Sequence, residues 1–241
     1  MCSSDLYNRS MVNTNDHLRA SIEVLYEDAN VLVVNKPAGL SMHRIGPKDE
    51  SITLRGIFAD KLASNDALRG GVVHRLDKDT SGVVILAKST SALEFLQAQF
   101  AARQVDKTYL ALVWGHLKHP EARIELPLAR SFKTPTVMAV RPGGKLSVSQ
   151  YKVLAEPGPY SYLEIMLHTG RTHQIRVQFA HLGHPVVGDK MYGHKKPPAG
   201  LNRQFLHAQK LAIILPGSNE KTIFKAELAV DLAKFLETVS G

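Results

Sequence analysis

Residues 74–87 read HRLDKDTSGVVILA, which joins a charged stretch to an apolar one. The polar half is typical of a turn, and the β-branched run over residues 83–87 predicts a buried strand. We therefore expect Asp77 on a loop that a rigid element supports. Arg75 and Lys78 flank Asp77, and nearby cations favour the charged form of a carboxylate. This pattern suits a nucleophile or an electrostatic anchor, and a surface charge cluster is the alternative interpretation.

The composition indicates a basic protein with an ordinary core. Among its 241 residues, 30 Lys and Arg stand against 22 Asp and Glu, and 44% of residues are hydrophobic. A net charge of +8 favours a polyanionic partner such as nucleic acid. The single cysteine, Cys2, excludes an internal disulfide framework and agrees with a reducing compartment, so we expect a cytoplasmic protein. No apolar run approaches the roughly 20 residues of a membrane span.

Short strands separated by turn signals dominate the pattern. Strands are expected over residues 22–26, 31–34, 83–87, 107–114, 151–155, 160–168, 206–215 and 221–228, and helices over 89–103, 173–182 and 231–239. This spacing favours an α+β domain on a mixed, largely antiparallel β-sheet over a doubly wound fold. We expect residues 1–20 to be a disordered leader and residues 21–241 to form a single domain.

Three separated segments combine charged groups with turn signals, namely residues 35–43, 74–82 and 169–176. The first places Lys36 at the end of a strand. In the last, Arg171 and Arg176 flank an expected helix start, where backbone N–H groups and the helix dipole attract anions. Either arginine is available to pair with Asp77. Tyr109, at the start of a strand, offers a ring that can stack on a base.

These segments also carry a resemblance to a known family. NKPAGL at 35–40, HRLDKDTSG at 74–82, KTY at 107–109 and TGRTHQIR at 169–176 occur in the order of the RluA-type RNA pseudouridine synthases. The chain resembles them over about residues 21–230, with GHP, GD and LHA as further matches. Its motifs are most similar to members that act on large-subunit ribosomal RNA. Many of those begin with an S4 RNA-binding domain, which we do not expect here, so transfer RNA stays open as a substrate.

The resemblance implies the pseudouridine synthase fold and isomerisation of a uridine in RNA without a cofactor. The base leaves C1′ of its ribose, rotates and rejoins through C5. Asp77 matches the catalytic aspartate, which either attacks C1′ or removes a ribose proton to give a glycal. Arg176 matches its basic partner, and Tyr109 matches the tyrosine that packs on the uracil, with a buried strand tyrosine as the alternative. Gln178 departs from the pattern, since many relatives have histidine there.

The resemblance also implies contacts with structured RNA, ribosomal or transfer, by a protein that we expect to act as a monomer. The uridine must leave its stack, which costs a few kcal/mol. Arg75 matches an arginine that enters the vacated space, and a second counterion for Asp77 is the alternative. The remaining side chains that we expect to contact RNA are His74, Lys36, Arg171 and His173.

Other chemistries fit the sequence less well. The histidines lack a carboxylate or cysteine at ligand spacing, so we predict no metal site. Asp77 and Asp79 stand too close in one turn to flank a sugar from opposite faces, as glycoside hydrolysis requires. A non-catalytic RNA-binding or RNA-folding module is the alternative function. Such a module has no need of the catalytic aspartate, which argues against it.

Overall fold

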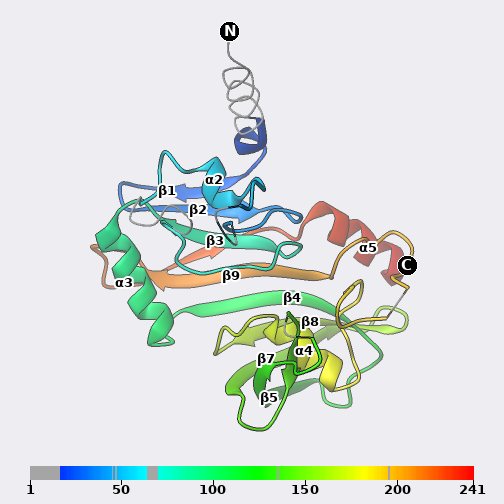
Figure 1. The fold of residues 1–241 in the computed structure, drawn as a ribbon. Helices are drawn as coiled ribbons and strands as arrows, with labels where there is room; N and C mark the ends of the chain where they lie inside the picture. Colours follow the sequence, from blue (N-terminus) through cyan, green and yellow to red (C-terminus); the bar gives the residue numbers. More distant parts are fainter. Residues whose placement is uncertain (1–16, 45, 47, 64–69, 135, 195) are drawn as a thin grey trace. The chain divides into compact units, whose positions relative to one another are not determined.

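The computed structural model describes residues 17–44, 46, 48–63, 70–134, 136–194 and 196–241 (Figure 1). These residues form two compact units. Unit 1 takes in the described residues up to Gln104 together with Ile213–Phe224, and unit 2 takes in Val105–Ala212 together with Lys225–Gly241. No helix in the described part of the chain is long and apolar enough to cross a membrane.

Unit 1 is built around adjacent antiparallel strands. The elements are β1 (Val24–Glu27), β2 (Val31–Lys36), α2 (Leu54–Ile57), β3 (Ser81–Ala87) and α3 (Thr90–Ala101). β2 lies between β1 and β3, and its register with β3 runs from Val31 opposite Ala87 to Lys36 opposite Gly82. As predicted, Ser89 caps α3, because its side chain accepts the amide of Ala92 at 3.2 Å.

The register of β2 with β3 brings the end of β2 to the charged turn that precedes β3. All residues of β3 are buried, as the apolar run predicted, and the strand starts directly after the loop that carries Asp77. Because Lys36 lies opposite Gly82, the end of β2 meets this loop. The prediction that Lys36 stands at a strand end is confirmed.

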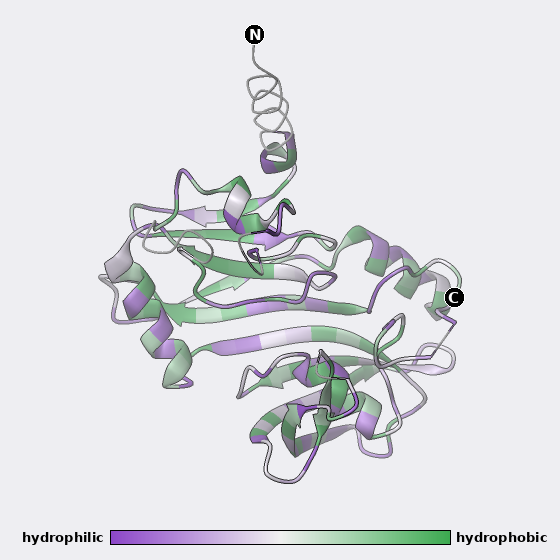
Figure 2. Cartoon of the chain, viewed as in Figure 1, coloured by the Kyte–Doolittle hydropathy of each residue, from purple (hydrophilic) through white to green (hydrophobic). Residues whose placement is uncertain are grey.

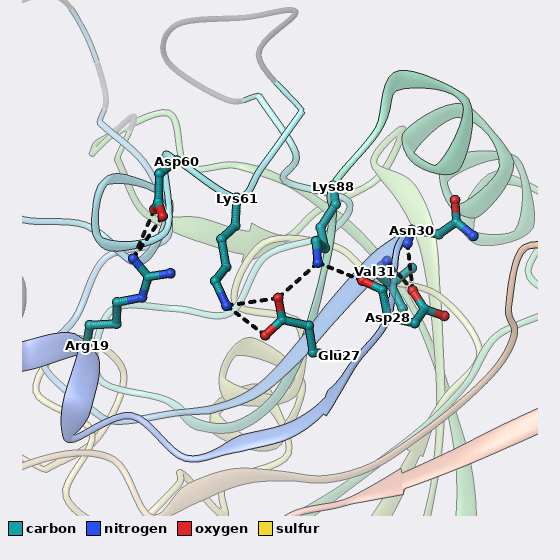
Figure 3. A network of polar contacts seen from close by, with 8 residues as sticks. All are labelled: Arg19, Glu27, Asp28, Asn30, Val31, Asp60, Lys61 and Lys88. Atoms are coloured by element: carbon teal, nitrogen blue, oxygen red, sulfur yellow. Dashed lines mark hydrogen bonds and ion pairs between the residues drawn. The ribbon is translucent and has the colours of Figure 1, made fainter.

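A polar network ties the turn between β1 and β2 to the residue after β3 (Figure 3). Glu27 accepts hydrogen bonds from Lys61 at 2.8 Å and from Lys88 at 2.9 Å. These two ammonium groups lower the pKa of the Glu27 carboxyl below its ordinary value. Lys88 also donates to the carbonyl of Asp28, and the Asp28 side chain accepts the amide of Val31 at 2.7 Å. The turn is therefore held both by its own Asp28 side chain and by the lysines that reach it from other segments.

Only the last four residues of the predicted leader are described. Its residues 1–16 lie outside the described residues, but residues 17–20 form a helical turn. Arg19 in this turn forms an ion pair with Asp60 at 3.0 Å and lies 5.2 Å from the centre of the Phe58 ring. The leader over residues 1–20 stays a prediction. The single catalytic domain over residues 21–241 stays a prediction.

Unit 2 contains a larger antiparallel array. In sheet order its strands are β9 (Leu206–Ile214), β4 (Asp106–Trp114), β8 (Tyr160–Leu167), β7 (Lys145–Ala155), β5 (Glu121–Arg130) and β6 (Met138–Val140). β10 (Lys221–Lys225) belongs to unit 1 apart from Lys225, and the helices of unit 2 are α4 (Gln174–His181) and α5 (Val230–Ser240). The predicted α+β class with a mixed, largely antiparallel sheet is confirmed.

The strands of unit 2 contribute to two apolar clusters, one with each helix. One cluster includes Ile175 and Phe179 of α4 among residues of β4, β5, β7 and β8. The other includes Leu232 and Phe235 of α5 together with Phe205. The alternating apolar and polar colours along α5 in Figure 2 fit a helix that buries one side. Both helices are therefore held on the sheet by their own apolar side chains, α4 through Ile175 and Phe179.

The sequence reading missed β5, β6 and the first half of β7. In β5 the run EARIELPLAR contains charged residues and Pro127, both of which weaken a strand pattern. The start of β7 carries Ser147 and Ser149, which are fully buried although polar. Tertiary hydrogen bonds stabilise them, and hydrophobic periodicity does not report such bonds.

Candidate active site

The Asp77 loop forms the predicted turn at the start of β3. The Asp77 carbonyl accepts the amide of Thr80 at 3.1 Å, and the Thr80 side chain is buried. Leu76 is also buried, whereas Arg75 is exposed and Asp77 is half-buried. The loop thus buries Leu76 and Thr80 and leaves Asp77 half-buried between them.

Lys36 fastens this loop from within unit 1. It is fully buried, and its Nζ donates to the carbonyls of Pro37 at 2.8 Å, Leu40 at 2.9 Å and Lys78 at 3.0 Å. Three carbonyl acceptors match the three N–H donors of an ammonium group. This burial argues against the predicted contact of Lys36 with RNA. Its ammonium instead joins the turn after β2 to the residue that follows Asp77.

Replacing Lys36 is expected to destabilise the protein. In Lys36→Met three carbonyls lose a charged donor, and an unsatisfied buried polar group costs about 1–3 kcal/mol. We expect the free energy of unfolding, measured in urea, to fall by about 2–4 kcal/mol. Lys78→Met is the matched control, because Lys78 takes part through its backbone carbonyl and its side chain is exposed. Equal stability of the Lys36→Met and wild-type proteins would contradict this account.

His74 lies beside β3 rather than in open solvent. Its Nε2 accepts the amide of Ile85 at 3.2 Å. Its ring stacks on Phe100 of α3, with the ring centres 4.8 Å apart and the planes inclined by 17°. His74 is therefore partly buried between a strand and a helix, whereas Arg75, the next residue, is exposed.

Tyr109 stands on β4 of unit 2 at an irregularity of the sheet. It pairs with Ile165 of β8 and with Ala208 of β9, and the register with β9 shifts between Thr108 and Tyr109. Such bulges redirect a side chain and are frequent next to active sites. Tyr109 is partly buried, and it packs against the apolar cluster that includes Ile175 of α4.

The loop before α4 is organised by the side chain of Gln174. Its Oε1 accepts the hydroxyl of Thr169 at 2.7 Å and the amide of Arg171 at 3.0 Å, and its Nε2 donates to the carbonyl of Val148 at 3.1 Å. His173 occupies the position before the helix with φ of 54°. A residue other than glycine in this left-handed region is strained, and such strain gathers at functional sites.

Arg176 forms a buried bidentate ion pair, but its partner was not predicted. Its Nε lies 2.6 Å and its Nη2 2.9 Å from the two carboxylate oxygens of Asp189. One of these oxygens also accepts the amides of Met191 at 2.8 Å and Tyr192 at 3.0 Å. Burial opposes ionisation of Asp189, but the hydrogen bonds and charge of Arg176 outweigh it and lower the pKa of Asp189.

Asp189 is expected to contribute to acid sensitivity. A carboxyl whose pKa is lower in the folded than in the unfolded chain stabilises the fold at neutral pH. The ordinary pKa of an aspartate is about 4. The contribution is lost as the pH falls from about this value toward the lower pKa that Asp189 has in the folded protein. We expect the urea midpoint of the wild type to fall between about pH 5 and pH 3, and that of Asp189→Asn to fall less. An equal fall in both proteins would refute the assignment to Asp189.

Tyr192 connects Arg176 to two other parts of unit 2. Its ring centre lies 5.2 Å from the guanidinium carbon of Arg176. Its hydroxyl lies 2.9 Å from Nδ1 of His173 and accepts the amide of Met138 in β6 at 2.9 Å. Asp189 and Tyr192 are the site residues that sequence reasoning missed. The GD dipeptide at residues 188–189 was the available signal.

Gln178, the departure from the family pattern, is fully buried on the other side of the same helix turn. Its Oε1 accepts the hydroxyl of Ser149 at 2.7 Å, and its Nε2 donates to the carbonyl of Ser147 at 3.2 Å. These bonds fasten α4 to β7. The departure therefore belongs to a satisfied structural contact.

The structure groups the predicted residues by unit. Unit 1 holds Lys36, His74, Arg75 and Asp77, and unit 2 holds Tyr109, Arg171, His173 and Arg176. The pairing of Asp77 with an arginine stays a prediction. Within the described ranges, no three His, Cys, Asp or Glu side chains gather where they could hold a metal ion.

Comparison with known proteins gives a consistent result. Residues 30–181 match the sequence model of a family described as RNA pseudouridylate synthase. The chain is 37% identical over 221 residues to the uncharacterized RNA pseudouridine synthase YlyB of Bacillus subtilis (strain 168), covering 90% of this chain and 73% of that protein. It is 40% identical over 232 residues to ribosomal large subunit pseudouridine synthase D of Xanthomonas campestris, covering 90% and 69%.

A solved structure supports the same fold. The structure titled human RNA pseudouridylate synthase domain containing 4 superposes with a TM-score of 0.78 at 24% sequence identity. The match covers 95% of this chain and 97% of that one. At this identity the likeness concerns the fold alone.

Proposed function

The chain belongs to the RNA pseudouridine synthase family, and from this premise we propose that it isomerises specific uridines of structured ribosomal or transfer RNA with Asp77 as the catalytic carboxylate. The observation that supports this most strongly is the Asp77 loop. A half-buried carboxylate stands on a turn that buried groups hold in place, within the matched residues 30–181. We place this activity in the cytoplasm and in a monomer.

The reaction exchanges one glycosidic bond for another. The bond between C1′ and N1 breaks, the uracil rotates, and a bond forms between C1′ and C5, after which C5 loses its proton. In one route the Asp77 carboxylate attacks C1′ and is displaced when C5 attacks. In the other it removes the C2′ proton as N1 leaves, which gives a glycal, and a proton returns to C2′ when C5 attacks C1′. Both routes require ionised Asp77, and the proposal includes either.

Arg176 is proposed to supply the positive charge that keeps Asp77 ionised and oriented. Asp189 holds its Nε and Nη2, which fixes the plane of the guanidinium. The partly buried Tyr109 is proposed to pack on the uracil and to take part in removing the C5 proton.

Arg75 is proposed to enter the space that the flipped nucleotide leaves, which fits its exposure beside Asp77. We expect Arg75→Ala to lower kcat/KM by about 10–100-fold on a folded stem-loop, because flipping a stacked base costs a few kcal/mol. On an unstructured oligonucleotide with the same uridine the loss is expected to shrink to a few-fold. Equal losses on both RNAs would favour the alternative role of Arg75 as a counterion for Asp77.

Arg171 and His173 are proposed to contact the RNA backbone at the start of α4. Their loop offers positive charge and backbone amides, which phosphates favour. Binding through phosphates makes the affinity fall steeply as the salt concentration rises. The name of the Xanthomonas relative favours ribosomal RNA as the first substrate to test.

The proposal is tested by mapping pseudouridine in total RNA from source cells with and without the gene. Complementation with the wild type or with Asp77→Asn completes the comparison. Loss of pseudouridine at a defined uridine, restored only by the wild type, is the expected result and identifies the substrate. If purified wild-type protein binds structured RNA but leaves every uridine unchanged, the chain is the non-catalytic RNA-binding module instead.

A further inference from the structure

His74 holds the chain three residues before Asp77. The hydrogen bond from the Ile85 amide to its Nε2 is 3.2 Å long, and Ile85 is a fully buried residue in the middle of β3. An accepting Nε2 carries no proton, so the imidazole in this contact is neutral, with its proton on Nδ1. His74 therefore uses its ring as an acceptor toward the strand.

The chain beside β3 explains why a side chain, and not a backbone carbonyl, accepts the hydrogen bond from the Ile85 amide. An isolated bridge pairs Val72 with Leu86, so the chain before His74 runs beside β3. One residue along the strand, the Ile85 amide meets the imidazole. A buried amide needs a hydrogen-bond partner, and His74 provides one where the backbone pairing is only a single bridge.

Phe100 restricts the same ring from another element. The imidazole and Phe100 rings are nearly parallel at 17°, with their centres 4.8 Å apart. A ring that is bonded at Nε2 and stacked against α3 has a fixed orientation. This arrangement argues against the predicted contact of His74 with RNA, which would need the ring to turn toward a ligand.

The Asp77 loop has a second attachment on its other side. The carbonyl of Lys78 accepts from the buried Nζ of Lys36 at 3.0 Å, and Leu76 is buried between the two attachments. Asp77 thus lies between a point fixed by His74 and a point fixed by Lys36. A small displacement of a reacting group costs about 10²-fold in rate when positioning matters.

We infer that His74 is a positioning residue for Asp77. By accepting a hydrogen bond from the Ile85 amide, it fixes the start of the loop that carries Asp77. This inference rests on the proposed role of Asp77. Gln reaches as far as Nε2 with its carbonyl oxygen and keeps an acceptor, whereas Leu fills similar space without one. The acceptor, and not the imidazole itself, is what the loop requires.

The test compares single-turnover rates and RNA affinities of His74→Leu, His74→Asn and His74→Gln at a temperature where unfolding curves show each protein folded. We expect the single-turnover rates of His74→Leu and His74→Asn to be about 10–100-fold lower than that of the wild type. Leu has no acceptor, and the Asn side chain is too short to reach the Ile85 amide. The affinity of both variants for RNA is expected to stay within about 2-fold of the wild-type affinity. His74→Gln is expected to recover most of the rate. His116→Leu removes an exposed histidine of unit 2 and serves as the control.

Each outcome bears on the inference. Weakened RNA affinity with an unchanged rate makes His74 an RNA contact and overturns it. A normal rate in His74→Leu or His74→Asn also overturns it, as does a His74→Gln rate no better than that of His74→Asn. If His74→Leu does not fold, the Asn and Gln pair still decides. Failure of the wild type to form pseudouridine would instead refute the proposed function.

Discussion

Asp77→Asn protein is expected to bind substrate RNA nearly as well as the wild type and to form no detectable pseudouridine. The amide has the size of the carboxylate, but it is neither a competent nucleophile at C1′ nor a base for the C2′ proton. Loss of a group that carries the chemistry costs at least about 10³-fold in rate. The measurement is the fraction of pseudouridine formed in a single turnover, with RNA affinity measured in parallel.

Asp79→Asn provides the matched control for this substitution. Asp79 lies in the same turn, and the substitution removes the same charge two residues away. If net charge near the loop were what mattered, both variants would lose activity to a similar degree. We expect Asp79→Asn to keep most of the wild-type rate. Uridine conversion by Asp77→Asn would refute the assigned chemistry by either route.

Asp189→Asn is expected to produce the largest loss of stability. The Asp189 side chain is fully buried and that of Arg176 is 7% exposed, so the substitution leaves a buried guanidinium without its counter-charge. Breaking a buried pair in this way costs about 3–5 kcal/mol. The free energy of unfolding in urea at neutral pH is the measurement.

The second Arg–Asp pair of unit 2 makes the comparison specific. Arg203 and Asp231 pair in the same bidentate geometry, at 2.6 Å and 2.8 Å, but the Asp231 side chain is 53% exposed. Solvent can replace much of what Asp231 supplies, so Asp231→Asn is expected to cost clearly less than Asp189→Asn. Equal losses in the two variants would show that burial does not set the strength of the Arg176 pair.

The sequence was sufficient to predict the elements whose signals are local. The apolar run of β3, the Ser89 cap of α3 and the turn at Asp77 each follow from the chemistry of a few adjacent residues. β5 was missed because Pro127 and its charged neighbours disguise a strand that tertiary pairing stabilises. A single sequence therefore predicts the elements that adjacent residues determine, and it misses those that depend on tertiary pairing.

The site was harder to predict because its contacts join distant residues. Lys36 was expected to contact RNA, but its side chain is fully buried and its ammonium donates to three backbone carbonyls. Asp189 and Tyr192 gave little local signal, yet they hold Arg176 from 13 and 16 residues away. Whether a charged side chain meets water or buried partners depends on packing, which residue spacing does not encode.

The central claim is that Asp77 drives exchange of the uridine glycosidic bond from N1 to C5. Because that exchange releases the hydrogen on C5, RNA labelled with tritium at C5 of its uridines reports the reaction directly. The account predicts tritium release into water with the wild-type protein and background release with Asp77→Asn, on total RNA that lacks the cell's own modification at the site. Tritium release by Asp77→Asn at the wild-type rate would contradict it.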